Sequence, residues 1–184
     1  MEAITGILTL KPGREKPVVN RHPWVFSGAI ERVEGAPEPG DLVAVNDHRG
    51  DYLATGYFNP HSQIRARLLS WDPNEAIDEV FWHGRLQQAL DGRTALALEP
   101  ETNAYRLVYA EADGLPGLVV DRYANYLVLQ SLTMGIEKRK EMLVGILADL
   151  LASAGILERS DVAVRGKEGL PETSGLLWGQ EPPD

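Results

Sequence analysis

The sequence of 184 residues contains no cysteine, and this absence excludes several kinds of site at once. Without thiols there is no disulfide and no zinc or iron–sulfur site with cysteine ligands. The four histidines (His22, His48, His61 and His83) are scattered and form neither an HxH nor an HExxH pattern. Because metal-binding histidines usually occur at such short spacings, we expect no metal site.

Other fingerprints are missing as well. The sequence has no GxGxxG after a strand, no GxxxxGK[ST] and no GxSxG, so we expect no nucleotide-binding loop, no nucleophile elbow and no cofactor site in this chain. No basic stretch followed by an apolar one opens the sequence, and no apolar run approaches the ~18 residues of a membrane span. These absences predict a cytoplasmic protein with no membrane partner.

Charge is unevenly distributed along the chain. The formal net charge is −9, yet residues 1–70 hold equal numbers of basic and acidic residues, so the whole excess of acid lies in the remainder. An acidic total argues against a nucleic-acid partner, but a local basic patch sets the local field. The asymmetry therefore predicts two modules with different partners.

The first 70 residues have the residue pattern of a small β domain. Apolar and polar residues alternate in short runs that are separated by Pro, Gly and Asn. We expect strands at residues 4–10, 24–30, 41–45, 52–58 and 64–71, and a short helix at 15–21 that ends before Pro23. This pattern predicts a compact β pseudobarrel over residues 1–71.

Near residue 72 the residue pattern changes from short alternating runs to helical spacing. Asp72 followed by Pro73 and Glu75 is typical of a helix N-terminus, and we expect that helix to run to about residue 94. A second helix is expected at 136–153 with Gly155 as its C-cap, and strands at 105–110, 118–122, 126–132 and 156–165. We interpret residues 72–178 as a strand-strand-helix-strand-strand domain that touches the first one, giving an α+β fold, and 179–184 as a linker.

Basic residues cluster early in the chain. Lys11, Arg14, Lys16 and Arg21 lie within eleven residues, on a loop and the short helix. They suit phosphate contacts, but a solvated charged face would have the same composition. His22 can either hydrogen-bond a phosphate or simply hold the turn before Pro23.

Two further groups of side chains lie on strands of the same domain. Trp24 and Phe26 alternate with Val25, and we expect the two rings in the core, although they could stack on bases. Arg65 and Arg67 share one face of a strand. They either extend the basic surface or keep the outer side of the strand solvated.

The second half offers weaker candidates. Asp113 lies in the polar loop EADGLPGL (111–118), and Asp121-Arg122 ends the next strand. With no nucleophile, His or Lys nearby, turn chemistry explains these carboxylates better than acid–base catalysis. The segments holding Arg159, Asp161 and Arg165 are polar and suit either an RNA-facing surface or an ordinary loop.

Five separated motifs carry a resemblance that covers essentially the whole sequence. They are LKPGREK (10–16), RHPWVFSGA (21–29), SQIRAR (62–67), EADGLPGLVVDR (111–122) and RSDVAVR with KEG (159–169). In these motifs the chain resembles the bacterial 23S rRNA large-subunit methyltransferase I family. The resemblance implies an N-terminal PUA domain, a middle strand-strand-helix-strand-strand domain, and a Rossmann-like catalytic domain that has no counterpart in these 184 residues.

The missing domain would carry the S-adenosylmethionine loop and the cysteine that attacks C6 of cytosine. The resemblance therefore implies that this chain positions 23S rRNA while catalysis and S-adenosylmethionine belong to the rest of a parent enzyme. The alternative is a stand-alone, non-enzymatic PUA-domain RNA-binding or adaptor protein, and a homodimer stays open.

The resemblance also assigns expected surfaces. PUA domains generally bind RNA along the groove beside their short helix, which here corresponds to Arg14, Lys16, Arg21 and His22. The middle-domain motifs would face either RNA or the missing catalytic domain, and their candidate residues are Asp113, Arg122, Arg159, Asp161 and Arg165.

Overall fold

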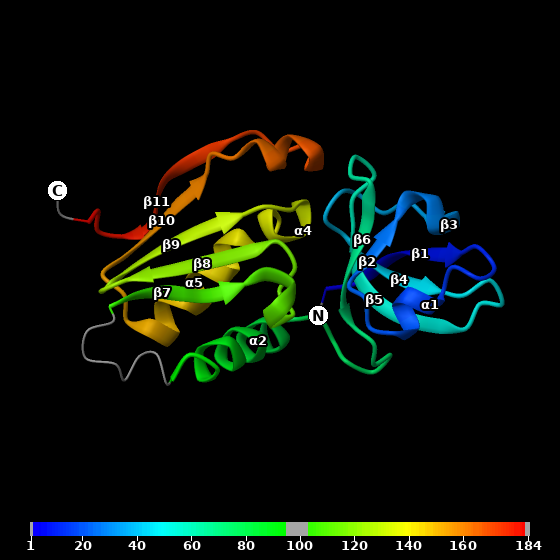
Figure 1. Cartoon of the computed structure of the whole chain (residues 1–184), viewed down its shortest axis with the longest axis horizontal. Coiled ribbons are helices and arrows are strands. Elements are labelled where there is room, and N and C mark those ends of the chain that lie inside the picture. The colour runs from blue at the N-terminus through cyan, green and yellow to red at the C-terminus, as the bar shows by residue number, and fades with distance from the viewer. Residues whose placement is uncertain (1, 95–102, 183–184) are drawn as a thin grey trace.

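Two sheets lie side by side in the computed structural model, which describes residues 2–94 and 103–182 (Figure 1). The first sheet has six strands in the order β2-β6-β5-β4-β1-β3 and is mixed, because β1 and β4 run parallel. Its strands are β1 (Ile4–Leu10), β2 (Trp24–Phe26), β3 (Ile30–Gly35), β4 (Leu42–Asn46), β5 (Tyr52–Phe58) and β6 (Ile64–Ser70).

The first sheet curls around its own apolar core. Leu8, Leu10, Val43, Val45 and Leu68 are almost completely buried there. The short helix α1 (Lys16–Val19) buries Val18 against the same core. Alternation of apolar and polar residues places these side chains inside, so the expected β-rich character of this half is confirmed.

One expected strand in this sheet is divided. Residues 24–30 were predicted as a single strand, but β2 ends at Phe26, a 3-10 turn (Ser27–Ala29) follows, and Ile30 begins β3. The two pieces lie at opposite edges of the sheet order, since β2 pairs with β6 and β3 pairs with β1. The turn at Ser27–Ala29 therefore carries the chain from one edge of the sheet to the other.

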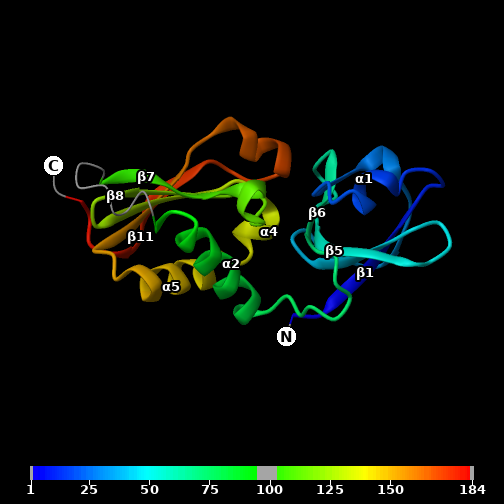
Figure 2. The same cartoon turned by 60° about the horizontal axis from the view of Figure 1, so that its bottom comes forward.

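The second sheet has five strands in the order β11-β10-β9-β8-β7. They are β7 (Ala104–Tyr109), β8 (Leu118–Tyr123), β9 (Tyr126–Ser131), β10 (Gly155–Ser160) and β11 (Thr173–Gly179). The single parallel pair, β9–β10, is connected through α4 (Met134–Glu137) and α5 (Lys140–Leu151), as a parallel connection requires. Helices α2 (Glu79–Asp91) and α5 lie along one face of the sheet (Figure 2).

The α+β class is confirmed, whereas several expected bounds are wrong. The first helix of this half starts at Glu79 because Asp78, rather than Asp72, accepts from the N–H groups of Val80 and Phe81. Asp72 instead holds a turn by accepting from the N–H of Asn74. The expected strands at 105–110, 118–122 and 126–132 all form and precede α4 and α5, so the strand-strand-helix-strand-strand order is one strand short. Two strands follow these helices, and no range was predicted for the second of them, β11.

The helix expected at 136–153 is two helices. It breaks at Lys138–Arg139 between α4 and α5, and Ala152 in a left-handed conformation ends α5. Gly155, expected as the C-cap, is the first residue of β10. The strand expected at 156–165 ends at Ser160, and a 3-10 helix, η3 (Ala163–Glu168), follows.

The two halves share apolar and polar contacts, in agreement with the expectation that they touch. Leu42, Tyr57 and Leu69 from the first sheet belong to the same buried cluster as the core of the second. No helix in residues 2–94 and 103–182 is long and apolar enough to cross a membrane.

Candidate nucleic-acid interface

A groove with a volume of about 380 Å³ lies beside α1 and β2 in the first half of the chain. The loop after β1, the helix α1 and the edge strand β2 meet there because Val18 and Val25 are both buried in the same core. Ten residues line the groove: Leu10, Arg14, Pro17, Val18, His22, Trp24, Val25, Phe26, Gly28 and Ala29.

The aromatic side chains of β2 line this groove, contrary to the expectation that they fill the core. Val25 is the residue that points inward, and it is 2% exposed, whereas Phe26 is 48% exposed and Trp24 is half-buried. The Trp24 ring meets both the Phe26 ring and the His22 ring edge to face, with centroids 6.2 and 5.7 Å apart. The strand thus presents two aromatic rings outward.

Basic side chains surround the same groove. Arg14 lines it, and Lys16 lies next to it on α1; both are exposed. Within the two described ranges, neither side chain has a hydrogen-bond or ion-pair partner. Lys11 is also exposed, and its Nζ donates to the carbonyl oxygen of Gly28 at 3.0 Å. Cations without acidic partners are available to bind an anion.

Arg21 ends helix α1 in an uncommon conformation. Its φ is 64°, in the left-handed region that usually selects glycine, and the next N–H, of His22, donates to Pro17. The Arg21 guanidinium lies over the Trp71 ring at 5.3 Å. The Trp71 indole N–H in turn donates to the carbonyl of Val18, which holds the Trp71 ring in place against the Arg21 side chain.

His22 has one nitrogen engaged and one free for another partner. The backbone N–H of Trp24 donates to its Nδ1 at 3.1 Å. Nδ1 is therefore the nitrogen without hydrogen, and Nε2 carries the N–H. This arrangement holds the turn before Pro23 and leaves an exposed donor beside the groove, so both expected roles are compatible with the geometry.

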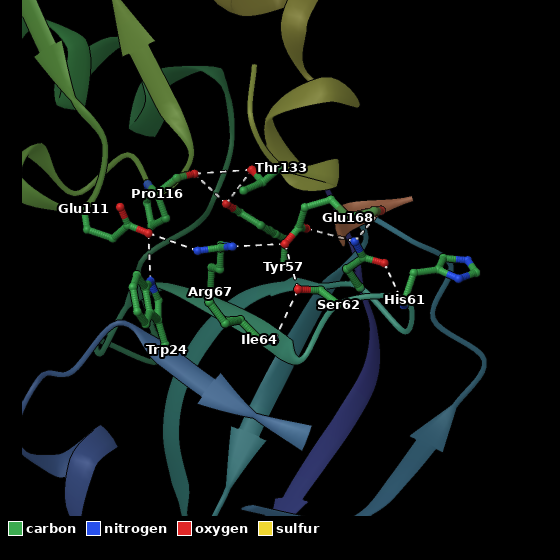
Figure 3. Close-up of polar contacts among 11 residues, drawn as sticks. Trp24, Tyr57, His61, Ser62, Ile64, Arg67, Glu111, Pro116, Thr133 and Glu168 are labelled. Atoms are coloured by element: carbon green, nitrogen blue, oxygen red, sulfur yellow. Dashed lines mark hydrogen bonds and ion pairs between the residues drawn. The ribbon is translucent and has the colours of Figure 1, made fainter. Parts of the chain in front are cut away.

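Arg67 occupies the junction of the two halves. Its guanidinium donates to Glu111 at 3.1 Å and to Glu168 at 3.0 Å (Figure 3). Glu111 also accepts from the indole N–H of Trp24 at 2.7 Å, while Glu168 accepts from Asn59 and Ser62. The charge of Arg67 is thus balanced inside the chain. Arg65 is half-buried, on the same strand.

Tyr57 makes the second polar contact across this junction. Its hydroxyl donates to the carbonyl of Pro116 and lies 2.9 Å from the Thr133 hydroxyl (Figure 3). Burial raises the pKa of the Tyr57 phenol well above its usual value, so the group stays neutral and acts as a hydrogen-bonding contact. Together these contacts hold the groove-lining strand next to the second sheet.

The candidate residues of the second half do not form one site. Asp113 accepts two hydrogen bonds from Arg93 at 2.7 Å, and Arg122 donates to the carbonyl of Ala124 in the adjacent turn. Arg159 and Asp161 form an exposed ion pair with each other. None of these contacts leads to the groove beside α1.

Arg165 differs from the expectation of a surface residue. Its side chain is 1% exposed, and it donates to Glu137 and to the carbonyls of Ser131 and Pro171. A buried guanidinium with these partners holds η3 against the second sheet and cannot face an RNA. In the described residues, no group of three or more His, Cys, Asp or Glu side chains could hold a metal ion.

The sequence reasoning missed Trp24 and Phe26 as surface residues and Glu111, Glu168 and Asn59 as contacts between the halves. The alternation in β2 contained the signal for the first two, because only Val25 or its two neighbours could face inward. The glutamates gave no such signal, since they are 44 and 101 residues from Arg67.

The PUA-like domain family matches residues 8–71, which contain both α1 and β2. The chain therefore contains a PUA-like domain, and the groove lies within it.

Relatives of known name extend the comparison to nearly the whole chain. Ribosomal RNA large subunit methyltransferase I of Escherichia coli O139:H28 is 48% identical over 176 residues, and that of Cronobacter sakazakii is 49% identical over 177. Each alignment covers 96% of this chain but only 44% or 45% of the relative. The chain is thus homologous to ribosomal RNA large subunit methyltransferase I and spans less than half of its length.

Solved structures agree on the fold. A protein of Streptococcus mutans described as a SAM-dependent methyltransferase superposes with a TM-score of 0.79, and SMU.776, described as a methyltransferase in complex with SAH, with 0.81. Both are 19% identical to this chain, and each match covers 98% of it and 44% of the solved chain. At this identity the likeness establishes the arrangement of the two sheets alone.

Proposed function

We propose that this chain is the RNA-recognition portion of an S-adenosylmethionine-dependent 23S rRNA cytosine-5 methyltransferase. Residues 1–71 form the RNA-binding domain in this proposal, and residues 72–178 form the domain that connects it to the rest of the enzyme. The observation that carries the proposal is the groove beside α1, where outward-facing rings and exposed basic side chains occur together within a PUA-like domain.

Each group in the groove has a distinct part in binding. Arg14 and Lys16 are exposed point charges that suit phosphate oxygens, and Nε2–H of His22 is an additional donor. Trp24 and Phe26 supply ring faces and edges on which unpaired bases can stack. Structured RNA with an accessible loop or strand offers both kinds of partner, and ribosomal RNA contains many such elements.

The methyl-transfer chemistry belongs elsewhere in the parent protein. This chain has no cysteine for the covalent step and no glycine-rich cofactor loop, so its residues do not fit S-adenosylmethionine. That assignment matches the alignments, which leave more than half of each relative outside the region shared with this chain. The expected RNA partner is cytoplasmic, which agrees with the predicted location.

Photochemical crosslinking of this chain to 23S rRNA, followed by identification of the modified peptides, tests the proposal. We expect crosslinks on the peptides that contain Trp24 and Phe26, since aromatic residues in contact with bases react readily. Crosslinks found only outside residues 11–29 would show that the groove beside α1 is not the RNA-binding surface.

A further inference from the structure

A second groove lies on the five-stranded sheet of the second half. It has a volume of about 560 Å³ and runs along the edge strand β7 and its neighbour β8. Tyr105, Arg106, Tyr109, Asp121, Tyr123 and Arg93 contribute to its walls. Tyrosine and arginine dominate this set, and neither the relatives nor the family match assigns it a role.

The register of β7 and β8 brings four of these side chains to one face of the sheet. Arg106 is opposite Asp121, Tyr109 is opposite Val119, and Tyr123 follows Asp121 by two residues. The alternate residues of β8, Leu118 and Val120, belong to the core covered by α2 and α5. The four side chains therefore stand on the face away from those helices, where Tyr109 and Tyr123 are 56% and 53% exposed.

The charges in this groove balance one another. Arg106 donates to both carboxylate oxygens of Asp121, at 2.8 and 3.0 Å, and lies over the Tyr109 ring at 5.1 Å. Arg93 is paired in the same way with Asp113. The groove consequently offers oriented ring faces with little net charge, and the two exposed rings are separated by about 13 Å along the strand direction.

This spacing distinguishes the groove from a surface that docks a protein. Apolar docking patches are contiguous, whereas here the Arg106–Asp121 ion pair lies between the two exposed rings. Exposed rings that are spaced along a channel suit a polymer whose flat groups repeat at intervals, as the bases of single-stranded RNA do.

One hydrogen bond links the strand of the first groove to the segment that follows β7. Tyr109 precedes Glu111 by two residues, and Glu111 accepts the indole N–H of Trp24, which lines the groove beside α1. Tyr109 is therefore the residue of β7 that is closest in sequence to the contact with Trp24. The contact between Trp24 and Glu111 fixes the relative position of the two sets of rings.

We propose that the β7–β8 groove binds single-stranded RNA that continues from the groove beside α1, by stacking bases on Tyr109 and Tyr123. This inference rests on the proposed function. Since its charges are balanced, the β7–β8 groove acts through stacking, which depends little on salt, whereas the groove beside α1 acts through phosphate contacts, which depend strongly on it.

The test compares two RNA probes with the full chain. One is a blunt-ended stem-loop, and the other is the same stem-loop with a single-stranded tail of about ten nucleotides, placed in turn at either end. We expect the wild type to bind the probe with a tail at one of the two ends more tightly than the blunt stem-loop. The double variant Tyr109→Ala with Tyr123→Ala should lose this gain, so that its affinity for that tailed probe falls by roughly 10-fold or more. The slope of affinity against salt concentration should stay as in the wild type.

Two variants control for structure. Tyr109→Phe with Tyr123→Phe keeps the rings and should retain the gain, and Trp178→Ala removes an exposed ring from the opposite edge strand, β11, and should change nothing. Equal affinity of the double alanine variant and the wild type for both tailed probes would overturn this inference. Binding of the blunt stem-loop by variants of Arg14 and Lys16 tests the groove beside α1 separately. The proposal for the β7–β8 groove and the proposal for the groove beside α1 can therefore be rejected independently.

Discussion

At the scale of single residues, Arg21 combines an unfavourable backbone conformation with an exposed charge. A left-handed φ costs an ordinary residue about 1–2 kcal/mol relative to glycine. A glycine would end helix α1 with less strain, so the cost of the backbone conformation and the contribution of the Arg21 side chain can be measured separately.

Two substitutions separate these effects. Arg21→Ala and Arg21→Gly both remove the guanidinium from the Trp71 ring, but only the glycine relieves the backbone. We predict that the glycine variant is the more stable one by about 1 kcal/mol in denaturant unfolding, with equally weakened RNA binding in both. Equal stabilities would mean that the backbone at Arg21 is unstrained.

Individual residues also show where prediction from the sequence ends. The basic cluster was found from composition because charge is local information, and Arg14 and Lys16 are exposed as expected. The orientation of Trp24 and Phe26 was predicted wrongly because alternation defines two faces without saying which is inside. That choice depends on Val18 and the other core residues, which contact Val25 from elsewhere in the chain.

At the scale of elements, helix α4 shows how closely the halves approach. A Cβ on Gly135 would overlap the ring of Tyr57, while a Cβ on Gly145, in the middle of α5, would meet nothing within 4 Å. The same change, glycine to alanine, therefore has opposite consequences at two sites ten residues apart.

We predict that Gly135→Ala destabilises the protein by roughly 1–3 kcal/mol because the Tyr57 ring has to move. Gly145→Ala should stabilise it by up to about 1 kcal/mol, since alanine is the better helix former. Thermal unfolding of both variants measures the difference, and a shift of the same sign in both would contradict the packing at Tyr57.

Glu137 forms ion pairs with Lys140 and Arg165, and these make the stability of the second half depend on pH. Burial raises the pKa of the Glu137 carboxyl, but hydrogen bonds from Arg165, Lys140 and Ser131 outweigh burial and bring the pKa to about 2, from an ordinary value of 4.5. Because the unfolded chain has the ordinary value, this carboxylate stabilises the fold above about pH 4.5, and the contribution is lost as the pH falls towards 2.

The prediction concerns Glu137→Gln. The variant should be less stable than the wild type at neutral pH, and the gap should narrow between about pH 5 and pH 2, by on the order of 1 kcal/mol given the partial exposure of the group. Glu141→Gln, on the exposed side of α5, is the control. Unfolding temperatures measured across this range would reject the prediction if the gap stayed constant.

Element types were predictable from the sequence where the pattern is long and regular. β1 and β5 begin and end where alternation predicts, and most of the remaining strands are shifted by only a residue or two. The helix expected at 136–153 was predicted without its break because apolar spacing continues through it. The break coincides with Arg139, which reaches the carbonyl of Gly40 and Glu2 in the first half, contacts that no local pattern reveals.

At the scale of the whole molecule, Arg67 connects the two halves. Its side chain and that of Glu168 are 12% and 4% exposed, so removal of the guanidinium leaves a buried carboxylate without its cation. Such an uncompensated charge costs about 3–5 kcal/mol when fully buried. Arg65, two residues earlier on the same strand, makes no ion pair within the described residues.

We therefore predict that Arg67→Ala lowers the unfolding free energy by about 2–4 kcal/mol, whereas Arg65→Ala changes it by well under 1 kcal/mol. The double variant Arg67→Met with Glu168→Leu should recover much of the loss, since it removes both charges together. If Arg67→Ala proved as stable as the wild type, the ion pairs drawn between the halves would not form in solution.

The proposed RNA binding in the groove beside α1 depends on phosphate contacts. The most direct measurement is the dependence of affinity for a 23S rRNA fragment on salt concentration, for the wild type and for Arg14→Ala with Lys16→Ala. The matched control, Arg32→Ala with Arg49→Ala, removes two exposed charges of the same half outside the groove. We predict that the slope of log affinity against log salt becomes shallower by about 1.4 in the groove variant alone, from about 0.7 per phosphate contact. An unchanged slope in the groove variant, or an equal change in the control, would mean that Arg14 and Lys16 do not contact RNA phosphates.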